Sequence, residues 1–191
     1  LPISENVSML PSIITTVEMV GITLLIAVPL GVFCAIYLCE YAKRGNKLVK
    51  IIRLATETLS GIPSIIYGLF GMLFFVTAIK WGYSILAGSF TLAIMVLPTM
   101  IRSTEEALLA VDDSYREGSF GLGAGKLRTV FVIVLPSAAS GILSGIILSI
   151  GRIVGETAAL IYTAGTVAKI PESVLDSART MSIHMYSLSR E

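Results

Sequence analysis

Two ionisable side chains lie within a long apolar stretch in the last third of the chain. Arg152 and Glu156 are four residues apart, and most of their neighbours between positions 136 and 163 are apolar or small. Charged side chains are costly at membrane depth, so a functional site is the default hypothesis. A guanidinium fork suits two oxygens of an oxyanion, and a carboxylate accepts hydrogen bonds. The alternative is that the two charges neutralise each other at i,i+4 and only hold helices together.

The elements that position this pair follow from the composition. Of the 191 residues, 54% are hydrophobic and 14% are charged, whereas a soluble domain has about 25% charged residues. A membrane-crossing helix needs about 20 apolar residues. The predicted spans are 12–41, 59–79, 84–101 and 136–163. We therefore expect one all-α integral membrane domain over 1–191.

Helical periodicity within these spans suggests polar faces. If 136–163 is one continuous helix, Arg152 and Glu156 share a small, polar face opposite a row of isoleucines. In span 59–79, Ser60, Ser64 and Tyr67 share a face and could supply hydroxyl donors to a pathway. The alternative explanation of that face is close helix packing. The two cysteines, Cys34 and Cys39, are predicted to be packing residues.

Basic residues give the orientation. Five lie between the first two spans and four between the third and fourth, while few lie on the other side. Since basic loops mark the cytoplasmic side, both of these loops are predicted to be cytoplasmic and the tail 164–191 extracytoplasmic. Arg102 ends the third span on the inner side. It could extend to lipid headgroups or attract an anion.

The inner loop 105–136 is predicted to be structured. Asp112 or Ser114 can cap a helix start, and Gly121, Gly123 and Gly125 then interrupt the sequence. His184, in the outer tail, is expected to be solvated. A short amphipathic helix in this inner loop either docks onto a partner or lies on the membrane surface.

The same loop resembles the EAA signature of ABC importer permeases. An acid and two small residues are followed after three residues by a glycine, and after nine more by Ile-x-Leu-Pro. In that family this loop forms the coupling helix that docks onto a cytoplasmic ATPase. The implied coupling residues are Glu117, Gly118, Ser119, Gly123, Leu135 and Pro136. Gly118 and Ser119 replace the usual alanines.

Other segments resemble the phosphate-specific permeases, in particular their PstA-type subunit. These segments are 27–31, 37–41, 61–68, 102–108 and 151–159. The resemblance covers nearly the whole chain and implies a type I ABC importer permease (MetI-like) core, with four transmembrane helices here and one more span expected on each side. It also implies a multi-pass protein of the bacterial plasma (inner) membrane.

Granted this family, the pathway residues implied are Arg152, Glu156, Arg102, Ser60, Ser64 and Tyr67. Phosphate keeps a proton near neutral pH and could donate a hydrogen bond to Glu156, whereas sulfate has no proton to offer. Glu156 is therefore a candidate residue for selecting phosphate over sulfate, by attracting protonated phosphate and repelling sulfate.

The resemblance also implies partners: a second, PstC-like permease, a dimeric PstB-like ATPase and a PstS-like extracytoplasmic phosphate-binding protein. The chain has no phosphate-binding loop, catalytic triad or zinc spacing. We thus expect a non-catalytic subunit that binds no cofactor, with ATP and Mg used by the ATPase.

Several alternatives remain at this stage. The chain could be the other permease subunit of the same system, or a permease for molybdate or sulfate. An ion-coupled secondary transporter would explain the intramembrane charges but not the EAA spacing. A structural scaffold without cargo would not explain a two-faced span.

Overall fold

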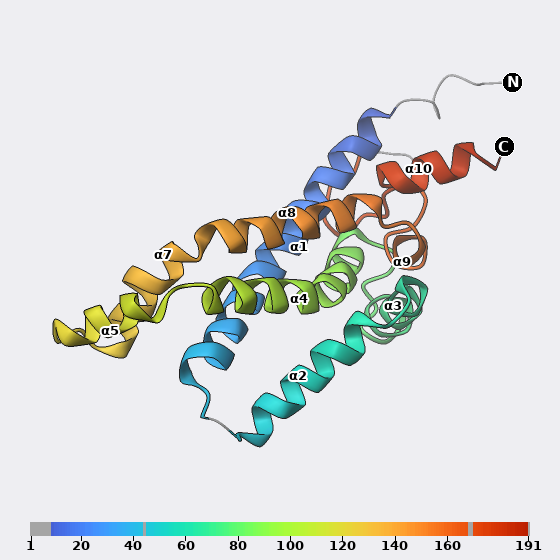
Figure 1. Cartoon of the computed structure of the whole chain (residues 1–191). Coiled ribbons are helices and arrows are strands. Elements are labelled where there is room, and N and C mark those ends of the chain that lie inside the picture. The colour runs from blue at the N-terminus through green and yellow to red at the C-terminus, as the bar shows by residue number, and fades with distance from the viewer. Residues whose placement is uncertain (1–8, 44, 168–169, 191) are drawn as a thin grey trace, which may run out of the picture. The chain divides into compact units, whose positions relative to one another are not determined.

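The computed structural model describes residues 9–43, 45–167 and 170–190, and its regular elements there are all helical (Figure 1). Three of these elements, labelled η, are π-helical turns that continue a neighbouring helix. In order they are α1 (Leu10–Ile36), η1 (Tyr37–Tyr41), α2 (Lys47–Ser60), α3 (Ser64–Gly71), η2 (Met72–Ala78), α4 (Ile85–Leu109), α5 (Asp113–Gly121), α6 (Lys126–Thr129), η3 (Val130–Val134), α7 (Leu135–Ser137), α8 (Ala139–Gly155), α9 (Ala158–Ile161) and α10 (Met181–Leu188).

The observed elements include helices of the type that the membrane prediction requires. Among the described residues, Leu10–Tyr41 and Ile85–Leu109 are each long and apolar enough to cross a membrane. Two helix pairs with a break between them also qualify if each pair counts as one span, namely Lys47–Ser60 with Ser64–Ala78 and Lys126–Ser137 with Ala139–Gly155. The expected all-α membrane fold is therefore confirmed.

The helices contribute to two compact units. The first contains the described residues within Leu1–Ile26, Gly61–Val96 and Ile150–Glu191, and the second contains Ala27–Ser60 and Leu97–Ser149. The long helices α1, α4 and α8 each contribute one part to each unit.

In the second unit, the core forms where the ends of α1 and α4 and the start of α8 meet the loop between α4 and α8. Its buried residues are small or branched apolar side chains: Ala35, Ile36, Leu108, Val111, Val130, Val134, Ala138 and Ile142. Burial of these side chains fixes the loop against the membrane helices, because each exposed methylene would cost about 0.8 kcal/mol.

In the first unit, α3 and α9 pack closely. A Cβ at Gly68 would lie 2.7 Å from the Cα of Ala159, so only glycine permits this approach. Nearby, Phe75 stacks on Trp81 at 5.5 Å between ring centroids, and both rings contact Phe90.

Three predicted spans differ from the observed helices, and the third, predicted over 84–101, continues as α4 to Leu109. The second is interrupted where Gly61-Ile62-Pro63 separates α2 from α3, because Pro63 lacks an N–H and disfavours helical geometry at Ile62. The fourth does not continue to Thr163. Helix α8 ends at Gly155, and α9 is a separate short helix.

Candidate functional site

The end of α8 places the intramembrane charges differently from the sequence prediction. Arg152 lies in the last turn of α8 and is exposed, whereas Glu156 follows the helix and is 9% exposed. The prediction that they share one helical face is wrong, since the helix stops at Gly155. Among the described residues, no ion pair joins them.

Glu156 has a defined structural environment. Its Oε1 accepts a hydrogen bond from the N–H of Ala159, 3.1 Å away in α9, which satisfies one otherwise unpaired amide of that short helix. Its backbone carbonyl accepts a hydrogen bond of 2.6 Å from Ser182 Oγ in α10. No hydrogen bond to Oε2 is found among the described residues. Glu156 thus links the end of α8 to α9 and α10.

Two residues of α3 complete the candidate residues of the first unit. Tyr67 is 4% exposed. Ser64 is the first residue of α3 and is partly buried. Tyr67 and Ser64 thus belong to α3, and Arg152 belongs to α8.

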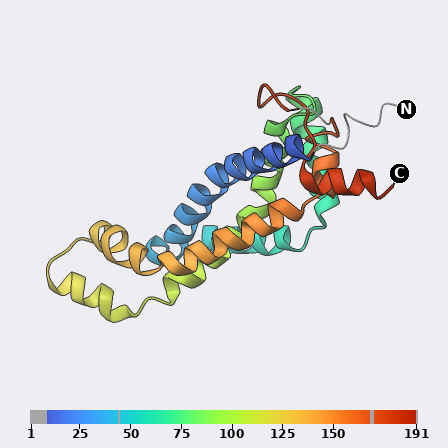
Figure 2. The same cartoon turned by 90° about the horizontal axis from the view of Figure 1, so that it is seen from above.

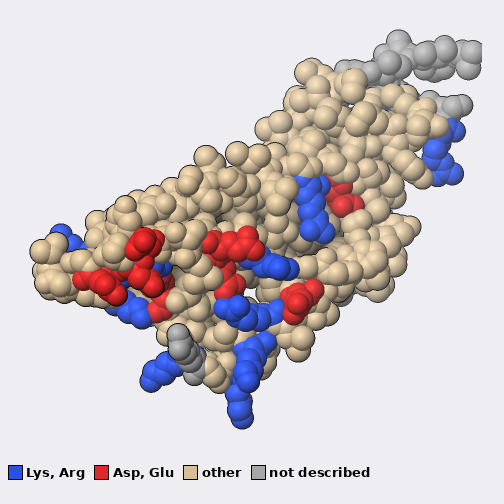
Figure 3. All heavy atoms as spheres, in the orientation of Figure 1, with Lys and Arg blue, Asp and Glu red and all other residues tan. Residues whose placement is uncertain are grey.

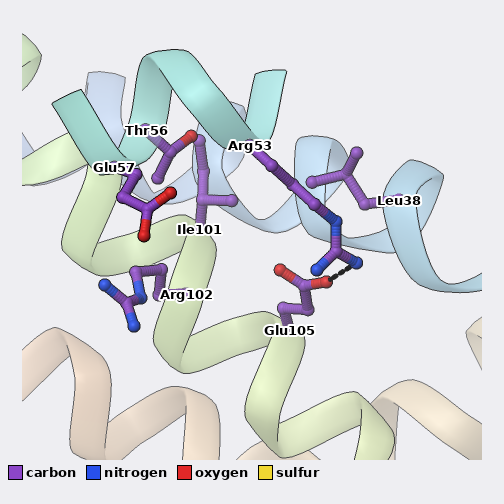
Figure 4. Close-up of a pocket in the computed structure, with 7 residues that line it drawn as sticks. All are labelled: Leu38, Arg53, Thr56, Glu57, Ile101, Arg102 and Glu105. Atoms are coloured by element: carbon purple, nitrogen blue, oxygen red, sulfur yellow. Dashed lines mark hydrogen bonds and ion pairs between the residues drawn. The ribbon is translucent and has the colours of Figure 1, made fainter. Parts of the chain in front are cut away.

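The second unit holds a separate charged pocket of about 190 Å³ between α2 and α4 (Figure 4). Arg53 of α2 forms an ion pair with Glu105 of α4, and Glu57 and Arg102 line the other side of the pocket. Ser60 lies at the end of α2, where its hydroxyl donates to the Thr56 carbonyl at 2.7 Å. Arg102 is thus a pocket residue, while the Ser60 hydroxyl is used within its own helix.

The inner loop is a helical hairpin, with α5 on one side and α6, η3 and α7 on the other (Figure 2). Asp112 caps α5, because its Oδ1 accepts from the N–H of Ser114 at 2.8 Å. Hydrogen bonds from Ser114 lower the pKa of the Asp112 carboxyl. The predicted helix start and Asp cap are confirmed.

The predicted coupling residues lie on both sides of this hairpin and in its turn. Glu117 and Gly118 are exposed on α5, and Ser119 is buried, with its hydroxyl 2.8 Å from that of Thr129. Gly123 has φ +83°, a backbone conformation that favours glycine. Next to it, Leu122 is 91% exposed. Leu135 and Pro136 belong to α7 on the returning side.

Charged residues gather on this second unit. On the face shown in Figure 3, most blue and red spheres lie over α2 and the α5 hairpin, which matches the basic loops in the sequence. Uncharged residues make up most of the remaining visible surface in that view.

Sequence reasoning missed two features of the site. The Arg53–Glu105 ion pair could have been suspected, since both residues lie at the predicted inner side. His184, predicted to be solvated, is fully buried in α10. The amphipathic pattern of an eight-residue helix is too short to reveal which side is covered.

Comparison with known proteins agrees with this architecture. Residues 27–187 match the family described as "Binding-protein-dependent transport system inner membrane component". The probable ABC transporter permease protein YqgI of Bacillus subtilis (strain 168) is 38% identical over 183 residues, covering 89% of this chain and 62% of the relative. The phosphate transport system permease protein PstA of Pasteurella multocida (strain Pm70) is 39% identical, covering 84% and 56% respectively.

Solved structures share the fold at lower identity. A chain of the MetNI methionine ABC transporter in an inward-facing conformation superposes with a TM-score of 0.66 at 18% identity, covering 95% of this chain and 84% of that one. A chain of an amino acid ABC transporter gives a TM-score of 0.59, with the same identity and coverage.

The fold and the loop hairpin thus define a type I ABC importer permease. The chain belongs to the family of binding-protein-dependent transport system inner membrane components. It resembles PstA-type phosphate permeases at 37–39% identity in several bacteria. The chain spans about half to three-fifths of the length of the curated relatives it matches.

Proposed function

We propose that the protein is the PstA-type permease subunit of an ATP-driven inorganic phosphate importer in the bacterial inner membrane. The observation that carries this proposal is the identity of 37–39% to phosphate permeases over most of this chain. In this scheme the chain forms half of the translocation pathway, and a related PstC-like subunit forms the other half.

The partners follow from the division of work between subunits. A PstS-like protein delivers phosphate outside, and a PstB-like ATPase dimer uses ATP and Mg in the cytoplasm. The α5 hairpin docks onto the ATPase through its coupling residues Glu117, Gly118, Ser119 and Gly123. The α7 residues Leu135 and Pro136 anchor the returning side of the hairpin.

Arg152 is the proposed anion contact of the pathway. It is exposed on the chain surface at the end of an apolar helix, where a guanidinium without an ion-pair partner among the described residues can hold two phosphate oxygens. Tyr67 and Ser64 are proposed hydroxyl donors to phosphate, whereas the Ser60 hydroxyl, which donates to the Thr56 carbonyl, is proposed as an acceptor. Arg102, in the α2–α4 pocket, attracts phosphate at the inner side.

Uptake of labelled phosphate tests this function. The full complex, in vesicles with internal ATP, is compared between the native protein and Arg152→Gln. We expect ATP-dependent uptake by the native complex, and a loss of at least about tenfold in the variant because a charge-assisted contact disappears. Arg190→Gln is the matched control, since it removes an exposed arginine whose side chain interacts with Tyr186 among the described residues.

Three outcomes separate the claims. Loss of uptake in Arg152→Gln with retained ATPase binding supports the pathway role. Unchanged uptake would make Arg152 structural. A native complex that moves molybdate or sulfate but no phosphate would overturn the substrate and leave the family membership intact.

A further inference from the structure

Arg116 of α5 ties the inner hairpin to the ends of two membrane helices. All of its contacts lie within the second unit. Its Nε and Nη2 donate to Glu40 Oε1 at 3.0 and 2.8 Å, so one carboxylate oxygen receives two bonds. Glu40 belongs to η1, the π-helical turn that ends the first span. The pair therefore joins the hairpin directly to the end of that span.

The same guanidinium also binds the end of α4. Nη2 donates to the Leu108 carbonyl at 2.9 Å, and Nη1 donates to the Val111 carbonyl at 2.9 Å and to Asp113 Oδ1 at 3.1 Å. The last carbonyls of a helix have no partner within the helix, so Arg116 satisfies one of those left open by α4. All five N–H donors of the side chain are in use.

Burial makes this arrangement rigid. The Arg116 and Glu40 side chains are only 15% and 9% exposed, whereas Asp113 is 85% exposed. Removal of one partner from a buried pair leaves an uncompensated charge, which is strongly destabilising. The contact between Arg116 and Glu40 is therefore persistent, while the Asp113 contact is solvent-screened.

A second contact links the same elements. The Lys126 ammonium of α6 lies 5.1 Å from the centre of the Tyr41 ring in η1. Both sides of the hairpin thus contact the π-helical turn. Such turns interrupt regular helix geometry and often occur at functional sites.

We propose that Arg116 is a positioning residue that makes α5, η1 and the end of α4 move as one body, so that displacement of α5 by the ATPase reaches the membrane helices. This inference rests on the proposed function, because it assigns how the coupling hairpin transmits motion. The planar fork of Arg116 is required, because lysine has three donors on one point charge and cannot reproduce five directed bonds.

The test uses the whole reconstituted transporter with Arg116→Lys and Glu40→Gln. Uptake of phosphate and hydrolysis of ATP are measured in the same vesicles. We expect the ATPase to remain bound and basal hydrolysis to persist, while phosphate transported per ATP falls by at least about tenfold, as loss of a hydrogen bond to a charged group predicts. Asp113→Asn is the matched control and should retain the native ratio.

A double variant covers the case in which single variants do not assemble. Glu40→Gln with Arg116→Met removes both charges, so no unpaired buried charge remains. We expect this variant to assemble with a low ratio of transport to hydrolysis. A native ratio in either assembled variant would overturn the proposal, as would failure of the double variant to assemble, which would make the pair a structural requirement only. If the native complex transports no phosphate, the proposed function fails instead.

Discussion

At the scale of single residues, Glu156 is proposed to set the choice between phosphate and sulfate. Its Oε1 is held by the Ala159 N–H, and Oε2 has no hydrogen bond within the described residues. Oε2 can accept a hydrogen bond from the O–H that phosphate retains near neutral pH, whereas sulfate would meet an unpaired charge. We expect Glu156→Gln to lower the ratio of phosphate to sulfate uptake by about tenfold, the value of a charged hydrogen bond.

Glu156→Gln keeps an oxygen that can accept from Ala159, so α9 should remain in place. Competition of unlabelled sulfate against labelled phosphate uptake measures the ratio. Glu172→Gln, an exposed carboxylate in the tail, is the control. If sulfate competes equally poorly against the native protein and Glu156→Gln, the carboxylate serves only to hold α9.

The types of these residues were predictable from the sequence, but their geometry was not. Arg152 and Glu156 were found because charges are rare in an apolar stretch. The prediction that they share one helical face was wrong, because it assumed one continuous helix. Helix α8 ends at Gly155, and the Glu156 side chain then accepts a hydrogen bond at the start of α9. Local side-chain capping competes with helix propagation, and periodicity does not detect it.

At the scale of elements, the packing of α10 is predicted to depend on pH. His184 is fully buried, and neither ring nitrogen has a hydrogen-bond partner within the described residues. Burial lowers the pKa of His184, and the nearby charge of Arg179 acts in the same direction. Two neighbouring hydrogen bonds of α10 join uncharged groups. The Met181 N–H donates to Thr16 Oγ1 of α1, and the Ser182 hydroxyl donates to the Glu156 carbonyl.

The direction of the pH effect on stability follows from the difference in the His184 pKa between the folded and unfolded protein. Because the folded pKa is depressed, the unfolded segment binds more protons as the pH falls below about 6.5, and stability decreases with falling pH in that window. We expect the melting temperature of the purified complex to fall between pH 7.5 and 5.5. The fall should be smaller in His184→Leu, which fills the space without titrating. An equal fall in both proteins would show that other groups cause it.

Helix types and approximate positions were also predictable at this scale. Long apolar runs indicated membrane helices, and Asp112 with three downstream glycines indicated a capped helix and its end. The break before α3 was not predicted. The predicted span 59–79 runs through Pro63, because proline is tolerated in membrane helices. The Arg116–Glu40 contact joins residues 76 positions apart, which hydrophobic patterns alone do not pair.

At the scale of the whole molecule, the hairpin tip is where the chain is proposed to meet its ATPase. Leu122 is 91% exposed beside the positive φ of Gly123, and Phe120 is 47% exposed on the same loop. An exposed apolar side chain at a structured tip suits a groove on a partner, because moving that side chain out of water into the groove is favourable. We expect Leu122→Asp to weaken ATPase binding by at least about tenfold, because a buried unpaired carboxylate opposes association.

Co-purification and titration of the ATPase against the permease complex measure this effect. Leu122→Met is the matched control, since it keeps an apolar side chain of similar volume. The substitution lies outside the hairpin core, so α5 should keep its cap at Asp112 and its contact between Ser119 and Thr129. Undiminished ATPase binding by Leu122→Asp would move the docking surface away from the tip, to the exposed flank of α5 around Glu117.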